Sequence, residues 1–283
     1  MTRAQTRCYR AHLPADNARV SKQSSRRALR GVALLAVTSL ARVAAGAADD
    51  APAVTPYRPS VSTPATLSAP GWLEVEAGVQ RSRADDPQRR DTLPYTLKLA
   101  FTPDWGVRIG GDALVRQVNA DGSRLSGGGD TTVVLKRRFA VDSVSAFGAE
   151  LSAKFATARG ELGSGHTDIG FNAIYSAGFG SMWHVDINAT ATHLGGVDFG
   201  TSGWQKGWAA ALSRNLTDTW SVVGELSGTQ RSGAGRTSQA LVATSYSVSP
   251  RWVVDLGASK GLSAASGGWS VFTGMTFLAA RVF

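Results

Sequence analysis

The residue types that could carry chemistry in this sequence are histidines, three of which follow the N-terminal basic region, and a set of regularly spaced charges. Hydrolysis by a nucleophilic Ser needs a neighbouring His held by a third polar group, and the candidates for that His are His166, His184 and His193. The Gly-x-Ser-x-Gly spacing occurs at Gly257–Gly261, but this segment lies in and at the end of an alternating stretch expected to be a strand. The nucleophile elbow needs this motif at a strand-to-helix turn, so we expect no enzyme. Cys8 is the one cysteine, and no two histidines have the i, i+2 or i, i+4 spacing of metal ligands. We therefore expect no metal and no cofactor.

The charges alternate with apolar residues, which is typical of strands with two unlike faces. Leu73, Val75 and Ala77, for example, alternate with Glu74 and Glu76. If the apolar faces meet lipid, the polar faces line a lumen. The lumen-lining candidates are Lys98, Arg108, Asp112, Arg116, Lys136, Arg138, Glu150, Lys154, Asp186, Glu225 and Asp255.

These inward charges allow two interpretations. Charges of both signs on neighbouring strands favour ion pairs across a narrow, mostly filled lumen. Alternatively, the lumen is a polar pore, in which the basic run Arg108, Arg116, Lys136 and Arg138 attracts anions.

The elements that position these residues are about twelve strands. Their expected ranges are 71–81, 93–101, 105–117, 129–139, 145–156, 167–176, 183–193, 206–214, 220–229, 238–247, 252–260 and 268–283. Tight breaks alternate with long, Gly-rich and polar ones, as expected for short periplasmic turns and long outer loops. The sequence predicts an all-β fold, a transmembrane antiparallel up-and-down β-barrel. Twelve strands do not decide whether its lumen is open.

Aromatic residues recur at one end of these strands, where they would form a girdle at the membrane interface. The set comprises Trp72, Trp105, Trp183, Trp220, Trp252 and the C-terminal Phe283. A terminal aromatic is also the usual signal for the barrel-assembly machinery, which we expect as a partner together with outer-membrane lipid.

The formal charge of +9 belongs to the N-terminus. Residues 1–47 hold nine of the 30 Lys and Arg residues but one of the 21 acidic residues, which leaves 21 basic and 20 acidic residues for the remainder. A basic region, a short apolar run and Ala45-Gly46-Ala47 predict a cleaved signal peptide over 1–47. The barrel is thus nearly neutral, and we expect no nucleic-acid partner.

Residues 48–70 contain five prolines and no apolar periodicity, which predicts an extended periplasmic arm before the barrel of residues 71–283. The arm would lie in the periplasm or fold back into the barrel mouth. The sequence does not decide between these positions.

The segments YRPSVSTPATLSAPGWLEVEAG, LPYTLKLAFTPDWGVRIG, GDTTVVLKRRF and GSGHTDIGFNAIYS resemble the transporter barrels of the phenol-degradation MetA-pathway family. The resemblance runs from Pro56 to Phe283 and implies an outer-membrane channel for small solutes, aromatic or hydrophobic compounds among them. The alternatives are a closed structural or adhesion barrel with binding loops and an outer-membrane hydrolase.

Overall fold

The computed structural model describes residues 52–283. The predicted signal peptide and Cys8 lie outside the described residues. Residues 52–283 belong to one compact unit. Its strands are β1 (Trp72–Arg83), β2 (Arg89–Ala100), β3 (Trp105–Val118), β4 (Arg124–Gly127), β5 (Thr131–Ala140), β6 (Ser145–Phe155), β7 (Asp168–Phe179), β8 (Trp183–His193), β9 (Trp204–Asn215), β10 (Trp220–Arg231), β11 (Thr237–Ser249), β12 (Trp252–Gly261) and β13 (Trp269–Arg281).

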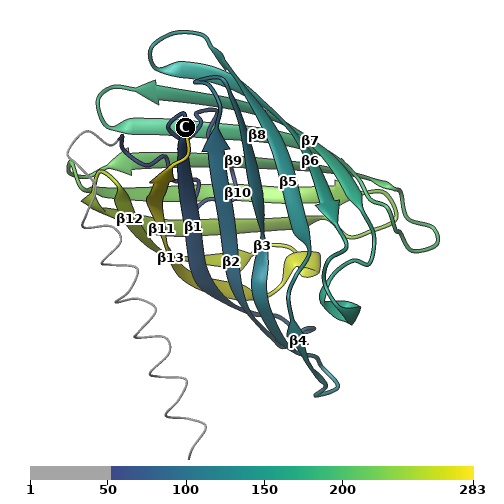
Figure 1. Ribbon diagram of the computed structural model, residues 1–283. Helices are drawn as coiled ribbons and strands as arrows, with labels where there is room; N and C mark the ends of the chain where they lie inside the picture. Colours follow the sequence, from purple (N-terminus) through teal and green to yellow (C-terminus); the bar gives the residue numbers. More distant parts are fainter. Residues whose placement is uncertain (1–51) are drawn as a thin grey trace, which may run out of the picture. The chain divides into compact units, whose positions relative to one another are not determined.

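The strands form one closed antiparallel barrel (Figure 1). Each long strand pairs with its neighbours in sequence, and β1 pairs with β13 to close the ring. The short β4 pairs only with the end of β3, in the connection to β5. Twelve strands therefore make the wall, as predicted. Closure pairs the backbone polar groups of both edges, which a sheet in lipid requires.

The predicted strand ranges agree with the structure to within a few residues, and 183–193 matches β8. β4 was not predicted, because its four residues lie in a Gly- and Ser-rich connection without alternation. Tight connections follow β2, β5, β7, β9 and β11, at what we call the turn end. Longer connections lie at the opposite loop end and include the one-turn helices η1 (Gly160–Leu162) and η2 (Ala264–Ser266). Among residues 52–283, no helix is long and apolar enough to cross a membrane.

The outward face of the barrel is apolar. Leu135, Leu151, Ile187, Leu212 and Leu256 are each at least 43% exposed. In water this surface would be unfavourable by roughly 25 cal/mol per Å² of apolar area. Lipid removes that cost, so this outward apolar belt is the lipid-facing surface of a membrane protein.

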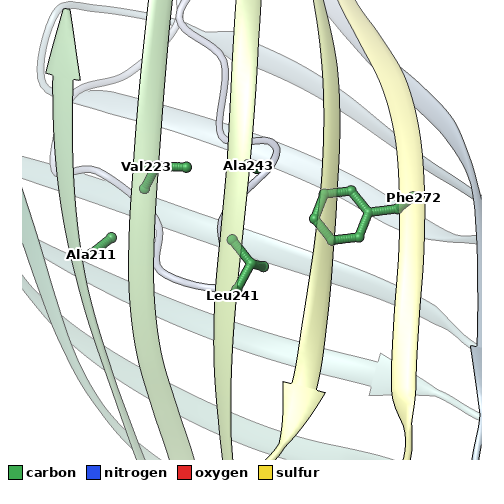
Figure 2. Close-up of a cluster of buried hydrophobic side chains, with 5 residues drawn as sticks. All are labelled: Ala211, Val223, Leu241, Ala243 and Phe272. Carbon is green, nitrogen blue, oxygen red and sulfur yellow. The ribbon is translucent and has the colours of Figure 1, made fainter.

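The inward face is mixed. Small and apolar side chains from β9, β10, β11 and β13 form a buried cluster on one side of the lumen, shown in Figure 2: Ala211, Val223, Leu241, Ala243 and Phe272. Phe272 can reach β11 because Gly257 of β12 has no Cβ, which would lie 2.5 Å from the ring. The remaining inward positions are largely polar and receive the arm.

Candidate functional site in the barrel lumen

The arm, residues 52–70, lies inside the barrel against inward side chains. Tyr57, Ala65 and Leu67 are buried although they belong to no strand. The sequence left open whether the arm lies in the periplasm or folds back into the barrel, and in the structure it folds back into the barrel. The partners of the arm come from β1, β2, β5, β6, β7, β8, β10 and β12, so the arm crosses the lumen.

The first contacts are made by two adjacent inward glutamates of β1. Glu74 accepts a hydrogen bond from Thr55 N at 3.0 Å, and Glu76 accepts one from Tyr57 N at 2.7 Å. Lys98 Nζ on β2 lies 2.6 Å from an oxygen of each glutamate and donates to the Thr55 carbonyl at 2.6 Å. One lysine thus compensates two buried carboxylates, whose other lone pairs accept from the arm backbone.

Arg58 reaches from the arm to Asp255 on β12. Its Nε and Nη2 each lie 3.1 Å from a carboxylate oxygen, a bidentate pair with 16% and 3% side-chain exposure. The guanidinium lies over Gly78 of β1 and Gly274 of β13. A Cβ on Gly274 would lie 2.5 Å from Arg58 Nε, so glycine is needed for this close approach.

Glu225 on β10 holds the middle of the arm. Its carboxylate accepts from the backbone N–H groups of Val61 and Ser62 and from the Ser62 hydroxyl, at 2.9–3.1 Å. No cation among the described residues pairs with it within 4.0 Å. The buried charge is therefore stabilised by amide and hydroxyl donors.

A network around Glu150 on β6 holds the next part of the arm. Arg108 of β3 and Lys136 of β5 lie 3.1 and 3.4 Å from the Glu150 oxygens. Asn188 Oδ1 accepts from Thr63 N at 2.9 Å, and Asn188 Nδ2 donates to the Thr63 carbonyl at 3.0 Å. The side-chain amide of Asn188 thus binds both the N–H and the C=O of Thr63, the two backbone groups that a neighbouring strand would bind.

Tyr57 lies between basic side chains of the wall. Lys98 Nζ and Lys136 Nζ lie 3.9 and 4.3 Å from its ring centroid, within cation–π distance. Its hydroxyl donates to the Thr66 carbonyl at 2.8 Å, which folds the arm on itself. Lys136 also donates to the Tyr57 hydroxyl and to the Pro64 carbonyl.

The arm divides the remaining lumen. A cavity of about 770 Å³ lies toward the turn end, between arm residues 53–66 and the wall of β8–β12. Cavities of about 440 and 590 Å³ lie toward the loop end, and Val61 and Thr63 line the first of them. Arg108 lines both loop-end cavities. A solute that crosses the barrel must pass the arm.

Four other predicted lumen residues form ion pairs or hydrogen bonds with residues outside the arm. Asp112 lies 3.8 Å from Arg90, and Arg138 lies 3.6 Å from Asp104. Lys154 pairs with Asp168 and lies 3.8 Å from Asp130. Asp186 accepts from Ser176 and lies 3.2 Å from His184 Nε2. Paired charges thus dominate this lumen.

Arg116 differs from its prediction. In the β2–β3 register Thr92 faces Val115 but Pro94 faces Asp112, so β3 has one extra residue there. Such a β-bulge exchanges the two faces of a strand. Val115 is therefore the inward residue, with 0% exposure, and Arg116 is exposed on the outer face opposite Asp91. The run Arg108, Arg116, Lys136 and Arg138 is not one stripe, because Arg116 lies outside and the other three are paired with acids.

The aromatics predicted at the interface lie at the turn end. Trp183 stacks on Phe179 at 6.3 Å between centroids, and Trp220 lies 4.9 Å from Tyr246. Arg137 lies over Trp105, and Trp252 begins β12. Trp72 differs, because alternation from Glu74 puts it on the inward side of β1.

Phe283 packs beside β1. Its carbonyl lies 2.7 Å from where a Cβ of Gly71 would be, and Gly71 has φ +78°, a conformation that favours glycine. Val282 N donates to the Gly71 carbonyl at 2.7 Å. The C-terminal residues thus extend the pairing that closes the ring.

The histidine candidates lie apart. His193 packs edge-on against Trp204 at 5.2 Å, His184 pairs with Asp186, and His166 is in the β6–β7 connection. No Ser hydroxyl within residues 52–283 forms a hydrogen bond with a His ring nitrogen. The same residues contain no group of three His, Cys, Asp or Glu side chains that could hold a metal.

Sequence reasoning missed Tyr57, Arg58, Ser62 and Thr63, because the arm has no periodicity. Asn188 could have been found, since it shares the inward parity of Asp186. A buried amide on that face indicates a hydrogen-bonding role.

Comparisons with known proteins support the fold. No protein-family model and no curated protein matches the sequence, so sequence comparison does not support the MetA-pathway family. Among solved structures, the chain is similar to the COG4313 outer membrane channel from Pseudomonas putida F1 (13% identity, 75% of this chain and 97% of that chain, TM-score 0.59). It is also similar to the KdgM porin (11% identity, 72% of this chain and 98% of that chain, TM-score 0.53). A third similar structure is the NanC porin (9% identity, 72% of this chain and 98% of that chain, TM-score 0.52). The predicted outer-membrane β-barrel is confirmed.

Proposed function

We propose that this chain is an outer-membrane channel for small solutes whose lumen is narrowed by the arm. The observation that carries the proposal is the division of the lumen. Cavities on both sides of the arm are lined by polar side chains, whereas a barrel with a purely structural lumen would be packed through its length. The fold, which is that of channels and porins, is consistent with this function.

The lining of the cavities favours small amphipathic solutes. The turn-end cavity has Ser213, Ser221 and Ser245 beside Ala211 and Val223. The 440 Å³ cavity is lined by hydroxyls of Ser152, Thr190, Thr192, Ser227 and Thr229. Hydroxyls that can donate and accept, next to apolar methyl groups, suit a solute with an apolar body and a few polar groups. The family resemblance implies aromatic or hydrophobic compounds, and an aromatic compound that carries a hydroxyl group has that character.

A closed structural barrel is the second candidate, and one observation favours it. The arm is held along its length by Glu74, Glu76, Asp255, Glu225 and Glu150. If these contacts never open, the barrel conducts nothing and its loops carry the function.

Fixing the arm to the wall distinguishes the two candidates. Ser176 Oγ lies 2.7 Å from Ala65 N, so these two positions are in contact, and we choose the double variant Ala65→Cys and Ser176→Cys to link the arm to β7 by a disulfide. The chain from Ala48 onward has no other cysteine. We expect single-channel conductance in planar bilayers to be low in the oxidised protein and to rise on reduction. The Ala65→Cys variant alone, given the same reductant, is the matched control.

If neither folded wild-type protein nor the reduced double-cysteine variant gives current steps, the channel is refuted and the closed barrel is favoured. If current flows equally in oxidised and reduced protein, the channel is retained but the arm does not narrow it. The solute class is tested by interruption of the ion current. We expect 4-hydroxybenzoate to interrupt it at lower concentration than glucose or hexanoate.

A further inference from the structure

Basic side chains of β12, β1, β2 and β3 gather on the outer face of the barrel at the loop end, with β13 between β12 and β1. Register places them in one row. Lys260 of β12 faces Trp269 of β13, and Trp269 faces Arg83 of β1. Arg81 of β1 faces Asp91 of β2, and Asp91 faces Arg116 of β3. With Arg89, which lies 3.4 Å from Asp91, we call these residues the basic patch: Arg81, Arg83, Arg89, Asp91, Arg116, Lys260 and Trp269.

The basic patch continues the outward apolar surface. Val79 and Leu93, each two residues from a patch member on the same strand, are 49% and 39% exposed. Val271, two residues after Trp269, is 44% exposed. Side chains two residues apart in a strand share a face, so the patch members also point away from the lumen.

The basic patch lies where the apolar belt ends. A tilted strand crosses the apolar region of a bilayer in about 9–11 residues. Lys260 is the ninth residue of β12 and Arg81 the tenth of β1, counted from the turn end. On β2, Asp91 is the tenth residue from Ala100. This is the level at which lipid headgroups begin.

The other side of the barrel has no such patch. On β6 and β7 the outward residues at this level are Phe155, Ile169 and Phe171, all exposed. Among the described residues of β5–β11, Lys206 on β9 is the single outward Lys or Arg there. The positive charge is therefore local.

Asp91 organises part of the patch. Its oxygens accept from Arg81 Nε at 2.6 Å and Nη2 at 3.2 Å, and Arg89 lies on the other side. Arg81 and Arg89 keep 51% and 43% of their side-chain surface exposed. The guanidinium groups of Arg81 and Arg89 are thus held side by side, and each has N–H donors that Asp91 does not use. The patch as a whole carries five positive charges and one negative charge. Planar guanidinium groups match phosphate oxygens in a bidentate geometry.

We propose that the basic patch is a binding site for the phosphate groups of an anionic lipid in the surrounding leaflet. The lipid's acyl chains would lie along Val79, Leu93 and Val271, and its phosphates would meet Arg81, Arg83 and Arg116. The site rests on the membrane location and does not depend on transport.

The test compares two triple variants in detergent. The patch variant carries Arg81→Gln, Arg83→Gln and Arg116→Gln. The control carries Arg124→Gln, Arg159→Gln and Arg236→Gln, which remove the same charge from exposed positions in the connections at the loop end, Arg124 being the first residue of β4. Binding of diphosphorylated and monophosphorylated lipid A is measured by native mass spectrometry, after circular dichroism has shown both variants to be folded.

We expect the patch variant to bind diphosphorylated lipid A about 100-fold more weakly, since each basic residue near an anionic lipid surface contributes roughly a factor of five. Arg116→Gln alone should lose about five-fold, and the control should bind as wild type does. Wild type should prefer the lipid with two phosphates. Equal binding by the patch variant and the control, or no dependence on phosphate number, would overturn the proposal.

Discussion

Glu225 and Ser62 are 163 residues apart in the chain, yet both the N–H and the hydroxyl of Ser62 lie 2.9 Å from the same carboxylate oxygen. The wall recognises the arm here mainly through its backbone. Glu225→Gln replaces one acceptor oxygen by a donor that faces other donors. Since hydrogen bonds to a charged group contribute about 2 kcal/mol each, we expect this variant to lower the unfolding free energy by about that amount and to increase conductance.

Urea titration of protein refolded in vesicles, followed by tryptophan fluorescence, measures the first effect, and bilayer recording measures the second. Asp198→Asn removes one negative charge from an exposed loop and should change neither. A Glu225→Gln protein with wild-type stability would show that the arm is not held at this point.

Arg58 and Asp255 form the most direct ion pair between arm and wall. Each single change, Arg58→Gln or Asp255→Asn, leaves a buried charge without its partner, which costs about 3–5 kcal/mol. The double variant leaves none, so we expect it to be more stable than the sum of the single changes predicts. A double-mutant cycle in urea gives the coupling energy directly. A coupling near zero would mean that the two side chains do not pair in the membrane-embedded protein.

Ion selectivity should depend on where each arginine lies. Arg108 lines both loop-end cavities, so Arg108→Gln should shift the reversal potential toward cation preference. Arg138 at the turn end is paired with Asp104 and should matter less. Arg116→Gln serves as the control, because the β3 bulge puts this residue outside. An equal shift for Arg108→Gln and Arg116→Gln would contradict the assigned faces.

The barrel was predictable from strand alternation, because this pattern is local and the polarity of each residue indicates whether it lies on the inward or the outward face. At Arg116 the same rule failed, because one extra residue in β3 exchanges the faces. The signal was present in the sequence: Leu114 interrupts the alternation of this strand.

The position of the arm could not be predicted for a different physical reason. Its partners lie far away in sequence, and many of its contacts use backbone N–H and C=O groups that every residue carries. Such recognition leaves no residue pattern in the arm. The complementary signal lies in the wall, where inward glycines such as Gly274 leave the space that Arg58 occupies.

Asp130 fastens the β6–β7 connection at the loop end. Its carboxylate accepts from Ala158 N at 3.1 Å and Ser164 N at 3.0 Å, and Leu162 and Ser164 of this connection line the 590 Å³ cavity. Burial alone would raise the Asp130 pKa, but the hydrogen bonds from Ser164 and Ala158 and the Lys154 charge outweigh it and lower the pKa.

Because the folded-state pKa is lowered, the carboxylate stabilises the connection fully above its ordinary pKa of about 4, and this contribution is lost as the pH falls through the lowered value. Asp130→Asn removes the carboxylate charge, so at neutral pH it should have the same effect on the connection as protonation of Asp130 at low pH. We expect trypsin to cleave this variant after Arg159 at pH 7.5 about ten-fold faster than wild type, from the loss of hydrogen bonds to a charged group. Asp121→Asn, at an exposed carboxylate that accepts within its own loop, should leave cleavage unchanged. Equal cleavage of Asp130→Asn and wild type would mean that other contacts hold the connection, and no acid-induced opening would then be expected.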